Sequence, residues 1–256
     1  MNMKKVTFSA FAVILFLVSV LSVYAQEMNP EAAKLYNAGN EKLKAGNYGA
    51  AITHYEDALK IQQDYRIFYQ KGISQRKAGK LQDAKVTFEE CIKLKSDFDG
   101  AYNALGGVLF SMGNLNEAVS NFEKVLQIST NNNTKNTVKK NLAKAYAKLG
   151  TNEISGGNSS KAIEYLTKSI EYDNYDAAYL SLAKLYSETG NYDKSLTASE
   201  SAMKYRSSIS KGGPYYYMGI AYKFKGDTQK AKEMFNNAKA DPQYKKTAEY
   251  ELTLLQ

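Results

Sequence analysis

From Tyr102 to Ile128 the chain reads YNALGGVLFSMGNLNEAVSNFEKVLQI, and this stretch decides its fold. Four landmarks stand in it at fixed spacing: Gly106, Gly113, the small Ala118 and the large Phe122. Gly113 is suited to end a first helix in a left-handed conformation, which is costly for a residue with a Cβ. The small residues let two helices approach closely, and Phe122 fills the space that this leaves. The stretch therefore predicts two short antiparallel helices joined by a tight turn.

The same pattern recurs along the 256-residue chain, with turn glycines 33, 34, 44, 33 and 36 residues apart. These glycines are Gly46, Gly79, Gly113, Gly157, Gly190 and Gly226. Five of them are followed nine positions later by a large residue, at Tyr55, Phe88, Phe122, Leu166 and Phe235. Such a period is typical of a solenoid, in which each repeat buries its apolar face against its neighbours.

At this point the chain resembles the tetratricopeptide repeat family, whose helix-turn-helix units of ~34 residues stack into a right-handed superhelix. The segment from Leu35 to Ile61 and the stretch quoted above carry the family spacing in full. The resemblance implies an all-α, right-handed superhelical solenoid of about six repeats with a C-terminal capping helix. We expect the repeats at about 32–64, 65–98, 99–130, 134–175, 176–208 and 212–242, and the cap at 243–256.

Three local features qualify this regular pattern. The 44-residue step predicts an extended first helix in the fourth repeat, because Thr134 to Leu149 has a helical pattern without a break. Asn131, Asn132 and Asn133 form a polar stop before it. In the fifth repeat Ser195 and Ser199 stand where the family prefers alanine and an aromatic residue. In the predicted cap, one helical face carries Tyr244, Ala248, Leu252 and Leu255.

The N-terminus has the pattern of a secretory signal. Lys4 and Lys5 precede an apolar run from Val6 to Val23, and Val23-Tyr24-Ala25 offers small residues at the positions a signal peptidase reads. We therefore predict a signal peptide at residues 1–25, a mature protein that begins at Gln26, and a periplasmic, secreted or envelope-associated location in a bacterium. An uncleaved anchor stays open, because the run is near the minimum length that spans a bilayer.

Charge and composition exclude several classes of function. The net charge is +8, and 32 basic against 26 acidic residues leave +6 once Lys4 and Lys5 are removed. A mildly basic chain without a recognition motif is not expected to bind nucleic acid. His54 is the only histidine, which excludes a Ser-His-Asp triad and a multi-histidine zinc site. Cys91 is the only cysteine. We predict no enzyme, no metal and no cofactor.

The resemblance implies a concave groove lined by the first helix of each repeat. The groove residues that we expect are Tyr36, Asn40, Lys44, Tyr69, Ile73, Arg76, Lys77, Asn103, Phe110, Leu180, Lys184, Tyr216, Ile220 and Lys223. Aromatic, aliphatic and basic groups alternate among them, which suits an extended protein segment or peptide that carries an acidic group. Only Asn40 matches the set with which chaperone-binding members clamp a terminal carboxylate, so we expect no such clamp.

The sequence thus predicts a non-catalytic protein–protein interaction scaffold of the bacterial cell envelope. A glycan-binding module is one alternative, because tyrosine-lined grooves can stack sugars. A structural subunit of an oligomeric envelope assembly is another. The oligomeric state stays open, and membrane contact is compatible with the sequence but not required by it. A second candidate surface, for phosphate headgroups or an acidic partner, is the lysine stripe Lys135, Lys139, Lys140, Lys144 and Lys148, although such a run can also be a solvated helix face.

Overall fold

The computed structural model describes residues 27–255, and within them the backbone forms thirteen helices and no strand. The helices are α1 (Pro30–Lys44), α2 (Tyr48–Ile61), α3 (Tyr65–Lys77), α4 (Leu81–Leu94), α5 (Asp99–Met112), α6 (Leu115–Ile128), α7 (Asn132–Ser155), α8 (Ser159–Tyr172), α9 (Asp176–Glu188), α10 (Tyr192–Lys204), α11 (Gly212–Phe224), α12 (Thr228–Ala238) and α13 (Lys245–Thr253).

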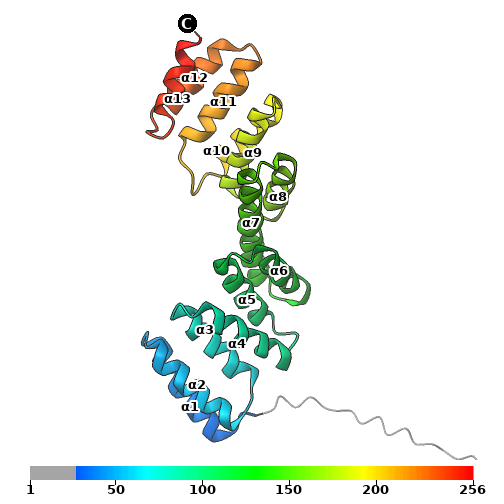
Figure 1. Ribbon diagram of the computed structural model, residues 1–256, viewed down its shortest axis with the longest axis vertical. Helices are drawn as coiled ribbons and strands as arrows, with labels where there is room; N and C mark the ends of the chain where they lie inside the picture. The colour runs from blue at the N-terminus through cyan, green and yellow to red at the C-terminus, as the bar shows by residue number, and fades with distance from the viewer. Residues whose placement is uncertain (1–26, 256) are drawn as a thin grey trace, which may run out of the picture.

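The first twelve helices form six consecutive pairs, each joined by a short turn. We call the first helix of a pair its A helix and the second its B helix. The pairs stack into an elongated molecule with α1 and α2 at one end and α13 at the other (Figure 1). The predicted all-α solenoid with a C-terminal capping helix is confirmed.

Five of the six pairs are closed by one glycine packed against one large side chain. A Cβ at Gly106 would lie 2.7 Å from the Phe122 ring, so only glycine lets the B helix approach this closely. The turn glycine of the same pair, Gly113, has a φ of 85°. This left-handed conformation is the one predicted for it. Four further pairs repeat the close approach, at Gly39 and Tyr55, Gly72 and Phe88, Gly150 and Leu166, and Gly219 and Phe235.

The fifth pair solves the same packing problem differently. Ala183 stands at the place of the close-approach glycine and Ser199 at the place of the large residue, and both are fully buried. The Ser195 hydroxyl donates a hydrogen bond to the Ala183 carbonyl over 2.8 Å. The hydroxyl of Ser199 has no hydrogen-bond partner among the described residues. One added methyl group on the A helix is thus matched by the loss of a ring on the B helix.

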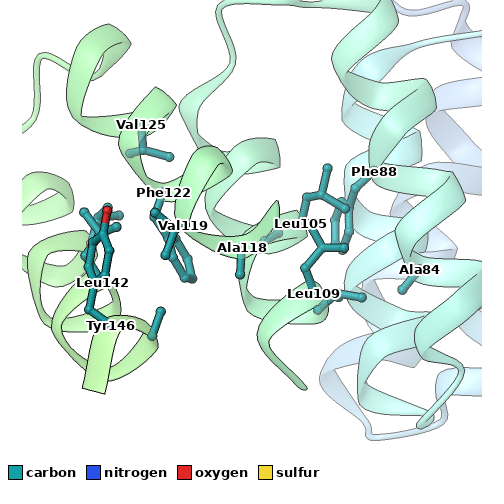
Figure 2. Close-up of a cluster of buried hydrophobic side chains, with 14 residues drawn as sticks. Ala84, Phe88, Leu105, Leu109, Ala118, Val119, Phe122, Val125, Leu142 and Tyr146 are labelled. Carbon is teal, nitrogen blue, oxygen red and sulfur yellow. The ribbon is translucent and has the colours of Figure 1, made fainter. Parts of the chain in front are cut away.

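The apolar core lies between successive pairs rather than at the centre of a globule. Figure 2 shows one cluster in which Phe88 of α4 lies near Leu105 of α5, while Phe122 of α6 faces Leu142 of α7. Phe88 and Leu142 are fully buried. Full burial of a side chain of this size contributes about 1.5–3 kcal/mol. Each repeat is therefore stabilised mainly by its neighbours.

Helix α7 is the long helix predicted for the fourth repeat, and it runs for 24 residues. Its N-cap is Asn131, whose side chain accepts a hydrogen bond from the backbone N–H of Thr134 over 3.1 Å. Asn132 and Asn133 already lie inside the helix. The prediction that all three asparagines precede it is wrong, because a single side-chain oxygen is enough to cap the first turn.

The joint between the fifth and sixth pairs is held by a buried carboxylate. Asp176 is fully buried at the start of α9. Its Oδ2 accepts the backbone N–H groups of Ser207 and Ser208, each over 2.6 Å, and that of Ile209 over 3.1 Å. Burial favours a higher pKa for Asp176, but these donors and the Ser208 hydroxyl lower that pKa to about 2. The ionised carboxylate thus fixes the loop that enters α11.

Helix α13 covers the last pair. Ala248 is fully buried with Phe235 of α12, and Tyr244, Leu252 and Leu255 pack around them. This is the apolar face predicted for the capping segment. Its polar face carries Glu251, which forms an ion pair of 2.7 Å with Lys223 of α11. The cap therefore binds both helices of the sixth pair.

The predicted signal peptide, residues 1–25, and the predicted cleavage before Gln26 lie outside the described residues. Among the residues that are described, no helix has both the length and the apolar character needed to cross a bilayer.

Candidate functional site

The A helices α3, α5 and α7 surround a hollow of about 240 Å³. Five predicted groove residues line it and are brought together from two repeats: Tyr69, Ile73, Arg76, Asn103 and Phe110. Their side chains provide two aromatic walls, one aliphatic surface, one amide and one guanidinium. We call this space the inner hollow.

Tyr69 forms one wall of the inner hollow and is held rigidly. Its ring centroid lies 5.0 Å from that of Phe98 and 6.0 Å from that of Phe88. Burial raises the pKa of the Tyr69 hydroxyl, and the nearby positive charge of Arg76 opposes the shift. The phenol is therefore neutral at physiological pH and offers both a donor and an acceptor.

The polar side of the inner hollow joins α5 to α7. The Asn141 amide group donates to the Asn103 side-chain oxygen over 3.4 Å. Arg76 is exposed and reaches toward α5, where its Nη1 lies 3.5 Å from the place that a Cβ of Gly107 would take. Among the described residues Arg76 forms no ion pair. A cation without a counter-ion thus stands beside aromatic and amide groups.

A second hollow of about 210 Å³ continues the first toward the C-terminus. The two share Phe110 and Lys144, and the second is completed by residues of α7 and of the segment that begins α9, among them Lys148, Thr151 and Tyr175. We call the two hollows together the inner groove. It runs along the A-helix face from the second to the fifth pair.

The predicted residues of the first pair lie outside the inner groove. The Tyr36 ring lies 6.0 Å from that of Tyr55, whose hydroxyl donates to the Asn40 side-chain oxygen over 2.8 Å. These contacts join α1 to α2. Lys44 is exposed. Lys77, also predicted for the groove, lies 5.7 Å over the Tyr48 ring and faces α2. No hollow described here reaches these four predicted residues.

In the fifth pair the two predicted residues have neighbours in their own chain. The Cδ1 atom of Leu180 lies 2.9 Å from the position that a Cβ of Gly213 would take. The Leu180 side chain therefore fills the space between α9 and α11. Lys184 is exposed and lies 3.8 Å from Glu188 one helical turn away. Neither residue lines the inner groove.

In the sixth pair the three predicted residues have neighbours in the capping helix. The Tyr216 ring lies 5.6 Å from that of Tyr244, Ile220 packs in the same cluster, and Lys223 is paired with Glu251. All three side chains are half-buried and face the capping helix, so their role in binding a partner stays a prediction.

Sequence reasoning missed Asn141 and placed Lys144 and Lys148 only in the lysine stripe. No residue of the fourth repeat was among the predicted groove residues. The signal was nevertheless present, because Asn141, Lys144 and Lys148 recur at spacings of three and four residues and so share one helix face.

Reactive groups elsewhere are occupied or buried. Burial raises the pKa of the Cys91 thiol to about 12, and its Sγ donates to the Tyr65 carbonyl over 3.2 Å. His54 is half-buried on α2. Within residues 27–255 no group of three His, Cys, Asp or Glu side chains is placed to hold a metal ion. The side chains that line the inner groove are of the kinds that bind a partner.

A separate hollow of about 340 Å³ lies between the B helices α8 and α10. Its floor includes Ile170, Leu182 and the rings of Tyr179 and Tyr186. Hydroxyl groups stand around this floor, at Thr167, Thr197 and Ser201. We call it the outer hollow.

Sequence profiles of the tetratricopeptide repeat match residues 35–65, 65–98, 99–174, 177–208 and 215–243. Together they account for nearly all of the six helix pairs. The chain belongs to the tetratricopeptide repeat family.

Known proteins share this repeat at low identity. Small glutamine-rich tetratricopeptide repeat-containing protein 2 of Mycosarcoma maydis is 28% identical over 133 residues, which are 52% of this chain and 37% of that protein. The chain thus spans little more than a third of the length of this relative.

Two solved structures share the fold. A MamA double mutant (RS-1 ArsTM) is 20% identical, covers 70% of this chain and 96% of its own, and has a TM-score of 0.52. YrrB, described as a tetratricopeptide repeat protein with an unusual peptide-binding site, is 19% identical, covers 78% and 97%, and has a TM-score of 0.51.

Proposed function

We propose that this tetratricopeptide repeat protein is a non-catalytic interaction scaffold that binds an extended segment of a partner protein in the inner groove. The observation that carries this proposal is the inner hollow, where Tyr69, Phe110 and Asn103 meet Arg76, a cation without an ion pair among the described residues. An aromatic wall with a few convergent polar groups is the usual composition of a binding site. The peptide-binding site reported for YrrB is consistent with this use of the fold.

The inner groove suits a peptide better than a globular surface. It consists of two adjoining hollows lined by the polar side chains of Asn103 and Thr151 and by the rings of Tyr69, Phe110 and Tyr175. Extended peptides gain affinity from hydrogen bonds along the main chain and specificity from side-chain hollows. Two hollows that share Phe110 offer two such side-chain sites.

Selection from a random peptide library, followed by titration calorimetry, tests the proposal. The variant Arg76→Glu reverses the charge in the inner hollow, and Lys139→Glu makes the same charge change at an exposed residue of α7 that lines neither hollow. We expect selected peptides to lose at least tenfold in affinity for Arg76→Glu and less than twofold for Lys139→Glu. Equal affinity for both variants would contradict the inner groove as the site.

We also propose that the scaffold acts in a bacterial cell envelope, as a periplasmic or secreted protein. The support is the pattern of Lys4, Lys5, the apolar run from Val6 to Val23 and the small residues that end at Ala25. Mass spectrometry of the N-terminus tests this. A mature chain that starts at Gln26 is expected, and an intact Met1 on membrane-bound protein would show that the segment is kept as an anchor.

The glycan-binding alternative is favoured by the outer hollow alone. Tyr179 and Tyr186 present ring surfaces there, and Thr167, Thr197 and Ser201 present hydroxyl groups. These are groups that stack on sugars and bind their hydroxyls. Calorimetry with envelope oligosaccharides against Tyr186→Ala tests this second function, which predicts binding that the variant loses while peptide binding is retained.

A further inference from the structure

The inner groove is cationic along its whole length. Arg76 stands in the inner hollow, Lys144 lines both hollows and Lys148 lines the second. Among the described residues none of the three forms an ion pair. The helices that supply them carry almost no acid, since α3 has none and the only acidic residue of α7 is Glu153. The nearest acid on the third lining helix is Asp99 at the start of α5, which acts on Tyr69 but forms no ion pair with the three cations. The groove therefore presents three cations that no carboxylate of the described residues pairs with.

The lysine stripe of α7 divides into two sides. Lys140, Lys144 and Lys148 recur every four residues and share one face, which the two lining lysines identify as the groove face. Lys139 is instead three residues from the fully buried Leu142 and seven from the buried Tyr146, so it lies on another side. The prediction that most of the five lysines share a side holds for these three.

The spacing of the three lysines matches that of an extended chain. Residues four apart on an α-helix are separated by about 6 Å along the axis. Alternate residues of an extended strand are separated by about 6.6 Å. Carboxylates at every second position of an extended peptide therefore meet successive lysines in register.

We propose that the partner segment is an acidic peptide in which Asp or Glu alternates with small residues, preceded or followed by one large apolar side chain. The apolar side chain lies in the inner hollow between Tyr69 and Phe110. Two carboxylates at alternate positions contact Lys144 and Lys148 in register, and the remaining carboxylate meets the charge of Arg76 in the inner hollow. This inference rests on the proposed function and adds to it the chemistry of the ligand.

The location of the cations favours a peptide over an anionic membrane. Lys144 and Lys148 line hollows between α5, α7 and α9. A bilayer surface is flat on this scale, whereas a single extended chain can enter a trough. Charge complementarity and shape thus point to the same occupant.

The test uses three synthetic peptides and two matched double variants. One peptide carries a leucine followed by three aspartates at alternate positions with serines between them, the second has asparagine for each aspartate, and the third has the three aspartates consecutive. The variant Lys144→Gln with Lys148→Gln removes two charges from the groove. Lys135→Gln with Lys139→Gln removes two charges from the same helix without touching either hollow.

Titration calorimetry at two salt concentrations measures the affinity of each peptide for each double variant. We expect the alternating peptide to bind at least tenfold more tightly than the other two, and only the groove double variant to lose this affinity and its salt dependence. Equal loss in both double variants, equal affinity for the aspartate and asparagine peptides, or no binding of the alternating peptide overturns the inference. So does tight binding of phosphatidylglycerol vesicles that depends on Lys144 and Lys148 without any peptide binding.

These failures are distinguishable from failure of the proposed function. If library-selected neutral peptides bind and lose affinity in Phe110→Ser but not in the groove double variant, the inner groove is a peptide site with another specificity. If selected peptides bind with no dependence on Arg76 or Phe110, the proposed function itself fails.

Discussion

A single buried carboxylate, Asp176, fixes the joint between the fifth and sixth pairs. Its pKa is held at about 2, below the value of about 4 of an unfolded aspartate. A group whose pKa is lower in the folded state adds stability above the unfolded pKa, and this stability is lost as the pH falls through the folded pKa. For a shift of this size the contribution is about 2 kcal/mol, fully present at neutral pH and lost between about pH 4 and pH 2.

The variant Asp176→Asn tests this assignment. The amide lacks the charge that three backbone N–H groups bind, so we expect urea unfolding at pH 7 to show a loss of about 2 kcal/mol. The difference in the free energy of unfolding between the variant and the parent protein should disappear as the pH is lowered toward 2. Asp83→Asn is the control, because Asp83 is exposed in the first turn of α4. A loss in Asp176→Asn that does not change with pH would mean that the side chain acts by shape and not by charge.

Single residues also show which features of the site the sequence predicts and which it does not. The choice of Tyr69, Arg76 and Phe110 as groove residues came from their register in the repeat, and the structure places all three around one hollow. Register did not reveal that the Tyr69 ring also packs on Phe88 and Phe98. Register gives the face of a helix, whereas these contacts depend on the angle between neighbouring repeats.

At the level of helices, five of the six pairs share one packing rule: a glycine on the A helix faces a large side chain on the B helix. The fifth pair replaces both members, with Ala183 and Ser199. In the other pairs an added Cβ would lie 2.6–2.7 Å from the facing side chain. The two positions must therefore change together.

A double-mutant cycle on Ala183 and Ser199 measures how strongly the two positions are coupled. Ser199→Phe alone is expected to destabilise by about 1–3 kcal/mol, because the new ring meets the Ala183 methyl group. Ala183→Gly combined with Ser199→Phe recreates the arrangement of the other pairs. We expect the double variant to unfold at a higher denaturant concentration than Ser199→Phe, with a coupling of at least about 1 kcal/mol. Strict additivity of the two single changes would show that the residues do not share one space.

The sequence predicted the helices and turns better than the contacts between helices. The turn glycines, the long α7 and the apolar face of α13 follow from local patterns that propensity and spacing encode. The hydrogen bond from Asn141 to Asn103 and the ion pair between Glu251 and Lys223 cannot be predicted from local patterns, because each joins two different helices. Asn141 was missed because it lies in the N-terminal half of the 24-residue helix α7, ahead of the positions that the family pattern covers.

The whole molecule is a stack in which neighbours supply stability, so its ends need protection. Here α13 covers the sixth pair, and its Ala248 is buried against Phe235 and Ala238. Solenoids that lack such caps expose apolar faces. Truncation before Gln243 is therefore expected to cause aggregation, seen as a rise in mass by light scattering. Glu251→Gln in the full chain is the control, because it removes only the ion pair with Lys223. A truncated protein that stays monomeric would show that α13 is dispensable.

The proposed binding mode places a partner segment in the inner groove of the second to fifth pairs. Photo-cross-linking tests it most directly, with a library-selected peptide that carries a benzophenone group and with mass spectrometry to locate the attachment. We predict attachment to residues of α3, α5 and α7 around Arg76, Phe110 and Lys144, and loss of attachment in Arg76→Glu. Attachment confined to the outer hollow between α8 and α10, or to α13, would contradict this binding mode.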